Sequence, residues 1–189
     1  MKFQGAKNYT LLDLGISQLY LNWEKIRAIE NWFRSDDMSI FQPLSVHDYG
    51  NGRYTIVDGH SRAFVAYKKG IKTVPIIYDK SELVAGEVAL QLYNADIEWC
   101  NRFHIEKISD LENRIITSEE YKKLWMERCD RSYDLLTQTT EAERRLMQEK
   151  VPNLYLYGAE EDLSKFYFED DFGKLYVYRD KVLSVETVE

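Results

Sequence analysis

The sequence predicts an α+β protein with a small mixed sheet and helices, followed by further helices and a small C-terminal antiparallel β appendage. Strand-like and helix-like patterns alternate up to about residue 80, helical periodicity dominates the middle, and short aromatic runs follow Pro152. A chain of 189 residues can bury one sizeable core and carry an appendage. We therefore expect a core over 1–110, a helical extension over 111–150 and a β appendage over 151–189.

The first elements are an extended segment beginning at Tyr9 and a helix that begins after Asn22. Asn is a favoured N-cap, because its side chain accepts hydrogen bonds from the first free backbone N–H groups of a helix. The helical spacing predicts one shared apolar face for four residues: Trp23, Ile26, Ile29 and Phe33.

A β-hairpin, a helix and a further strand follow. Pro43–His47 and Arg53–Val57 read as two strands joined by a glycine-rich turn. The pattern becomes helical after Gly59 and stops at Lys68-Lys69-Gly70, where cations and a glycine favour a helix end. Thr73–Tyr78 reads as the next strand, and Pro75 predicts an edge position or a strand start.

The second half begins with helices. Residues 81–104 are predicted to be helical, Thr117–Glu120 fits a capping box, and 133–149 reads as one more polar helix. Four arginines of these helices are expected on exposed faces: Arg128, Arg131, Arg144 and Arg145. Three tryptophans of the chain are expected in the core: Trp32, Trp99 and Trp125. The expected strands are Leu154–Tyr157, Phe166–Phe168 and Leu175–Tyr178, with a turn at Asp170–Gly173.

Composition and charge exclude several classes of protein. No apolar run approaches the length of a membrane span, and Met1–Gly5 lacks a signal-peptide pattern, so we expect a cytoplasmic protein. The net charge is −7, with +2 in residues 1–79 and −9 in residues 80–189. Without a basic stripe, specific DNA binding is not expected. The two cysteines and three histidines do not suggest a disulfide framework or a zinc site.

The most informative stretch is the turn Asp58-Gly59-His60-Ser61-Arg62 between a strand and a helix. A helix N-terminus attracts anions, and Gly59 lets a phosphate approach the backbone closely. Ser61 offers a hydroxyl, and Arg62 a fork of donors suited to phosphate. Asp58 can hold a magnesium ion or orient His60, which can donate to a phosphoryl oxygen. The alternative is that these are ordinary turn, cap and surface residues.

The segment from Gly52 to Ile76, GRYTIVDGHSRAFVAYKKGIKTVPI, resembles the signature of the ParB/sulfiredoxin superfamily. That signature is a hairpin, a nucleotide-binding turn, a helix and a strand that often contains Val-Pro. The resemblance covers about residues 10–80. Sulfiredoxins carry a catalytic cysteine where this chain has His60, so sulfiredoxin activity is not implied. ParB proteins bind CTP through a turn whose acidic residue and first arginine are replaced here by His60 and Ser61.

The turn is most similar to that of the free serine kinases of this superfamily, Asp-Gly-His-His-Arg, from which it departs only at Ser61. Those kinases place a catalytic glutamate near the start of the preceding helix, where this chain has Glu24. The resemblance implies catalytic residues Glu24, Asp58 and His60 and nucleotide-binding residues Gly59, His60, Ser61 and Arg62. A glutamate in a first helical turn is also favoured by the helix dipole alone.

Three functions remain open at the level of the sequence. The first is a phosphotransferase that uses ATP or ADP, or CTP, with magnesium, and acts on a small hydroxylated metabolite such as an amino acid. The second is a non-catalytic ParB-like module that binds or senses a nucleotide. The third is an interaction protein with a vestigial site, working through its C-terminal strands. The acceptor, the nucleotide base, the metal ligands and the oligomeric state are not determined by the sequence.

Overall fold

The structure is a computed structural model that describes residues 5–35 and 37–187, and it has the predicted α+β fold. The chain forms two compact units, Met1–Tyr121 and Lys122–Glu189. Most of the N-terminal segment considered above for a signal peptide, Met1–Gln4, lies outside the described residues. Each unit is described by itself.

Unit 1 is built on a four-stranded mixed sheet in the order β1 (Lys7–Thr10), β5 (Thr73–Tyr78), β3 (Leu44–Asp48), β4 (Tyr54–Asp58). β3 and β4 form the predicted antiparallel hairpin, and β5 runs parallel to β3. The edge position expected from Pro75 is wrong, because β5 lies between β1 and β3. The pairing of β5 with β3 starts at Ile76, one residue after Pro75. The missing backbone N–H of Pro75 therefore removes no hydrogen bond from that pairing.

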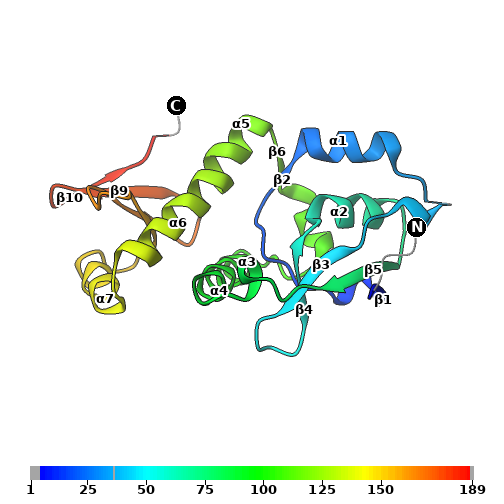
Figure 1. The fold of residues 1–189 in the computed structure, drawn as a ribbon. Helices are drawn as coiled ribbons and strands as arrows, with labels where there is room; N and C mark the ends of the chain where they lie inside the picture. Colours follow the sequence, from blue (N-terminus) through cyan, green and yellow to red (C-terminus); the bar gives the residue numbers. More distant parts are fainter. Residues whose placement is uncertain (1–4, 36, 188–189) are drawn as a thin grey trace. The chain divides into compact units, whose positions relative to one another are not determined.

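Two helices lie near this sheet, α1 (Trp23–Trp32) and α2 (His60–Lys68), and Figure 1 shows α1 running alongside α2. The apolar residues of the strands and of α2 form the core, and the fully buried ones include Leu44, Val46, Ile56, Ala63, Ala66, Val74 and Ile76. The prediction for α1 is right for Ile26 and Phe33, which are buried. It is wrong for Trp23, which remains 49% exposed. The separate expectation that Trp32 lies in the core is also wrong, because Trp32 is 38% exposed.

The start of α1 is fixed by hydrogen bonds to the Asn22 side chain and by strand pairing of the backbone just before it. The Asn22 side chain accepts hydrogen bonds from the backbone N–H groups of Glu24 and Lys25, as an N-cap does. It also accepts one from the hydroxyl of Ser118. The short strands β2 (Leu21–Asn22) and β6 (Ile115–Ile116) pair in parallel next to it. The sequence did not reveal this pair, because two residues show no periodicity.

The remaining elements of unit 1 are mostly helical. The predicted helical region 81–104 is divided into α3 (Glu82–Ala85) and α4 (Glu87–Arg102). Three short 3₁₀ segments occur at Leu11–Asp13, Met38–Ile40 and Ile108–Asn113. α5 (Ser118–Tyr121) opens with the predicted capping box, in which the Thr117 N–H donates to Glu120 and the Glu120 N–H donates to the Thr117 hydroxyl.

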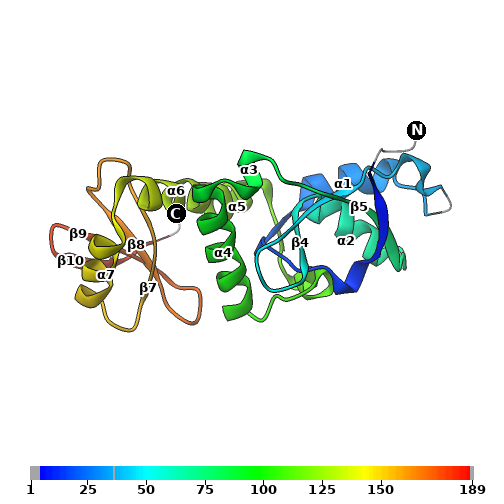
Figure 2. The ribbon, with the colours of Figure 1, turned by 60° about the horizontal axis from the view of Figure 1, so that its bottom comes forward.

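Unit 2 combines helices with a four-stranded antiparallel sheet (Figure 2). A π-helical segment (Lys122–Met126) leads into α6 (Glu127–Gln138), and α7 (Glu141–Lys150) follows. The strands are β7 (Tyr155–Ala159), β8 (Phe166–Glu169), β9 (Leu175–Arg179) and β10 (Val182–Val185), in the order β10-β9-β8-β7. The sequence missed β10, whose turn uses positive φ at Asp180 and Lys181 without a glycine.

Two expectations about unit 2 are wrong. The single helix expected over 133–149 breaks at Thr139, because Thr140 caps a new helix with a second capping box to Glu143. Arg128 is buried against the sheet, 3.8 Å from the Glu169 carboxylate, instead of being exposed, and Arg131 is largely buried. The predicted turn at Asp170–Gly173 is confirmed, with Gly173 donating to the Asp170 carbonyl.

No helix within residues 5–35 and 37–187 is both long enough and apolar enough to cross a membrane.

Candidate phosphate-binding site

The predicted turn lies where β4 ends and α2 begins. Gly59 is the N-cap of α2 and has φ +103°, in the left-handed region that disfavours residues with a Cβ. A Cβ at this position would lie 2.7 Å from Leu44 Cδ2 and 2.8 Å from Arg62 Nη2. The turn therefore requires a glycine for two reasons, the backbone conformation and the close approach of both side chains.

The first turn of α2 has no side-chain cap. Gly59 offers no cap, whereas Asn22 caps α1 and Thr140 caps α7. The N–H groups at the start of α2 are therefore not used by a capping side chain and are available to an anion. They border a cavity of about 320 Å³ that is lined by the whole turn, by part of α1 and by two further residues. The lining residues are Gln18, Lys25, Ala28, Ile29, Asp58, Gly59, His60, Ser61, Arg62 and Tyr121.

Arg62 is folded back over the turn. Its Nη2 donates to Asp58 Oδ2 at 2.9 Å and to the Pro43 carbonyl at 3.4 Å. The Asp58 carboxylate is 73% exposed and Arg62 is 19% exposed, so water weakens this ion pair. A phosphate bound at the turn would compete with Asp58 for Arg62. The structure thus brings Asp58, Gly59 and Arg62 together, with Arg62 Nη2 bonded to Asp58 and the buried Arg62 Nε without a hydrogen-bond partner among the described residues.

His60, which the sequence suggested as a donor to a phosphoryl oxygen, is a buried residue. It is 4% exposed, and its Nε2 accepts a hydrogen bond from the Ser17 N–H at 3.4 Å. Burial lowers the pKa of His60 to about 4, so the imidazole is neutral at pH 7. An accepting Nε2 places the proton of the neutral ring on Nδ1. His60 therefore brings no positive charge to the cavity.

Glu24 and Lys25 lie at the start of α1, and only one of them borders the cavity. Lys25, Ala28 and Ile29 follow the helical spacing i, i+3, i+4 and form one stripe along the cavity wall. Glu24 is exposed and is not among the lining residues. From the sequence, Glu24 was expected at this site and Lys25 was not. The i, i+3, i+4 pattern with Ile29 was the signal that could have identified Lys25.

The turn carries one carboxylate for a magnesium ion, that of Asp58. Among the described residues, no group of three or more His, Cys, Asp or Glu side chains could hold a metal ion. Magnesium in nucleotide sites is commonly held by one or two carboxylates together with the phosphates. Asp58 fits this role once Arg62 turns to the phosphate, and the ion would supply charge neutralisation there.

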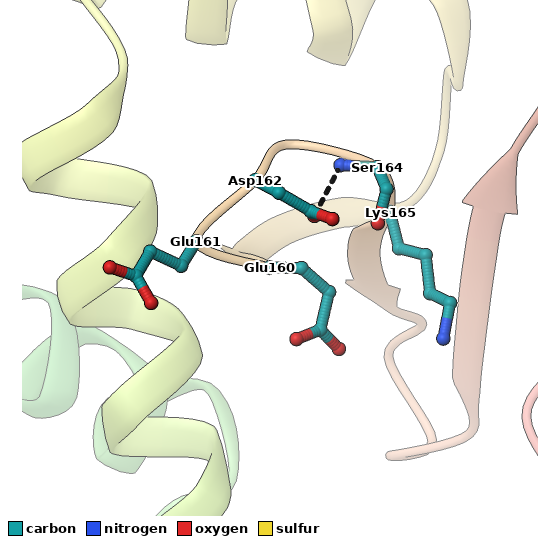
Figure 3. Close-up of a pocket in the computed structure, with 5 residues that line it drawn as sticks. All are labelled: Glu160, Glu161, Asp162, Ser164 and Lys165. Carbon is teal, nitrogen blue, oxygen red and sulfur yellow. Dashed lines mark hydrogen bonds between the residues drawn. The ribbon is translucent and has the colours of Figure 1, made fainter.

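A larger cavity of about 640 Å³ lies in unit 2 at the loop between β7 and β8. It is lined by Glu160, Glu161, Asp162, Ser164 and Lys165 (Figure 3). Figure 3 shows the carboxylates of Glu160 and Glu161 pointing in different directions, while Asp162 accepts a hydrogen bond from the Ser164 N–H. Negative charge repels phosphate and the carboxylates do not converge, so we place the candidate site at the turn after β4.

Comparison with known proteins does not assign a family to the chain. No family model matches it, and no curated protein matches it. Among solved structures, protein Atu1540 from Agrobacterium tumefaciens is similar with a TM-score of 0.35 and 12% sequence identity. The match covers 57% of this chain and 61% of the Atu1540 chain. At this TM-score the likeness supports no argument, so any function must be argued from the chain's own residues.

Proposed function

We propose that unit 1 binds the phosphate end of a nucleotide at the turn Asp58–Arg62. One observation carries the proposal: the first turn of α2 lacks a side-chain cap and opens, through Gly59, onto a cavity that Lys25 and Arg62 also line. Backbone N–H groups, the positive end of the helix dipole and two cations favour phosphate there. The likeness of the turn to the nucleotide-binding turn of the ParB/sulfiredoxin superfamily supports the same ligand class.

The observed geometry favours binding over catalysis. Phosphate binding uses groups that already border the cavity, whereas phosphoryl transfer also needs a base to take the proton of the acceptor hydroxyl. Glu24 does not line the cavity, and His60 is buried with Nε2 engaged. A nucleotide-binding module is therefore our first choice, and its candidates are ATP, ADP and CTP.

Phosphotransfer to a small hydroxylated metabolite is the second candidate, and Asp58 favours it. Its exposed carboxylate lies at the rim of the same cavity. Once Arg62 turns to the phosphate, Asp58 is released to hold magnesium or to accept a proton. Conversion of ATP to ADP that depends on an added acceptor would establish the second candidate. Binding of nucleotide without such turnover would establish the first.

The substitution Arg62→Ala tests the proposed site. It should weaken nucleotide binding by about 1.5–3 kcal/mol, the range for hydrogen bonds to a charged group. The stability of the ligand-free chain should change by less than about 1 kcal/mol, because the Asp58–Arg62 pair is partly exposed. Calorimetric titration with ATP, ADP and CTP plus magnesium measures the first effect, and a thermal melt measures the second.

Lys69→Ala is the matched control, because Lys69 is exposed at the opposite end of α2. It should leave nucleotide affinity unchanged. If the parent protein binds none of the three nucleotides, the proposed function is wrong. If Arg62→Ala and Lys69→Ala bind nucleotide equally well, Arg62 does not bind the phosphate.

A further inference from the structure

Lys25 brings a positive charge to the cavity wall without a carboxylate to neutralise it. Its Nζ lies 5.5 Å from the centre of the Tyr121 ring, and no ion pair among the described residues involves it. The backbone of Lys25 is fixed by the Asn22 cap, so its side chain starts from a defined point on α1. The charged side chains that line the cavity are Lys25, Asp58 and Arg62, so their charges sum to +1 in a chain with net charge −7.

The two cations of the cavity come from different helices. Arg62 belongs to the first turn of α2 and Lys25 to the first turn of α1. Arg62 is paired with Asp58, whereas Lys25 and the positive end of α2 face the cavity with no carboxylate of the described residues paired to Lys25 or capping α2. A ligand with two anionic groups can bind the first turn of α2 and Lys25 together, whereas a single phosphate satisfies one of these two positions.

We propose that Lys25 is a second phosphate-binding residue and that the site recognises a diphosphate group, such as that of ADP, rather than a single phosphate. This inference rests on the proposed function of the same turn. The N–H groups of α2 and Arg62 bind one phosphate, and Lys25 binds the next. A volume of about 320 Å³ is near the lower limit of ligand pockets, so the cavity takes the phosphate end and leaves the base outside.

The test compares ADP, pyrophosphate and inorganic phosphate as probes for the parent chain, Lys25→Gln and Lys69→Gln. The parent should bind ADP and pyrophosphate at least about tenfold more tightly than inorganic phosphate, because each charged hydrogen bond adds affinity. Lys25→Gln should weaken ADP and pyrophosphate binding by about five- to twentyfold and inorganic phosphate by less than about twofold. Lys69→Gln, which removes the same charge elsewhere, should match the parent.

The outcomes separate this inference from the proposed function. A parent that binds ADP no better than inorganic phosphate overturns the diphosphate inference and leaves a phosphate site. ADP affinity that is the same in Lys25→Gln and Lys69→Gln overturns the role of Lys25. A parent that binds none of the three probes overturns the proposed function and the inference together. A thermal melt of each variant checks that it is folded.

Discussion

Gly59 shows how much of the candidate site depends on a single residue. Its left-handed φ lets β4 pass directly into α2, and the missing Cβ leaves room for Leu44 and Arg62. The same two features predict that the position tolerates no other residue without loss of stability.

Gly59→Ala should destabilise the protein by at least about 2 kcal/mol, from backbone strain plus a contact of 2.7 Å with the buried Leu44 side chain. Gly50→Ala is the matched control, since Gly50 also has positive φ (+93°) but has open space around the added Cβ. Gly50→Ala should lose only about 1 kcal/mol of stability, from backbone strain alone. Urea denaturation measures both values. Equal losses in the two variants would mean that the contacts with Leu44 and Arg62 are relieved at no cost.

His60 predicts a pH dependence of stability. The imidazole takes up a proton near pH 6.5 in the unfolded chain but only near pH 4 in the folded chain, because burial disfavours its charged form. The neutral ring therefore stabilises the fold fully above about pH 6.5, and this contribution is lost as the pH falls towards 4. The full loss is on the order of 3 kcal/mol.

The free energy of unfolding, measured between pH 6.5 and pH 5, should fall with pH in the parent protein. The carboxylates whose pKa is lowered by hydrogen bonds, such as those of Asp79 and Glu120, lose protons at lower pH and contribute little in this window. His60→Gln should remove most of the slope, and His104→Asn, at an exposed position, should retain it. A parent protein whose stability is flat over this range would contradict the buried, neutral state of His60.

At the scale of elements, the helix starts are the best-defined local structures in the chain. Asn22, Thr117 and Thr140 each satisfy the first N–H groups of a helix, whereas α2 leaves its N-terminus to the cavity. The helices α3, α4 and α6 also begin without a side-chain cap, so a missing cap alone does not mark a binding end. The first turn of α2 differs because it borders a cavity that Lys25 and Arg62 also line.

Thr140→Ala should destabilise unit 2 by about 1 kcal/mol, because it removes the acceptor for the Glu143 N–H and one partner of the Glu143 carboxylate. Thr137→Ala is the control: Thr137 lies inside α6 and donates to the Tyr133 carbonyl without capping a helix. It should change stability by less than about 0.5 kcal/mol. Urea denaturation followed by circular dichroism compares them. An unaffected Thr140→Ala variant would show that the capping box does not hold the start of α7.

At the scale of the whole molecule, the chain divides into a unit that carries the candidate site and a unit with its own sheet and helices. Unit 1 contains the turn, the cavity and both cations. Unit 2 has a separate apolar core that includes Leu135, Tyr157, Tyr167 and Phe168. The third function that the sequence left open, interaction through the C-terminal strands, concerns this second unit and stays a prediction.

Local sequence patterns were sufficient for the elements that short-range interactions determine. The hairpin of β3 and β4, the glycine turn at Gly59 and the extent of α2 follow from turn chemistry and helical periodicity. The edge position of Pro75 and the unbroken helix over 133–149 were wrong. Strand order depends on distant segments, and the capping box at Thr140 lies within a run of polar residues that reads as one continuous helix.

The sequence by itself determined that a glycine turn with Ser61 and Arg62 opens a helix, because backbone conformation and helix starts are local properties. Only the tertiary structure decided which side chains meet there. The packing of α1 beside α2 turns Lys25 towards the cavity and leaves Glu24 outside, and Ser17 reaches His60 from 43 residues away. Adjacent residues on a helix point about 100° apart, so the choice between Glu24 and Lys25 depends on how the helix is rotated against its neighbours.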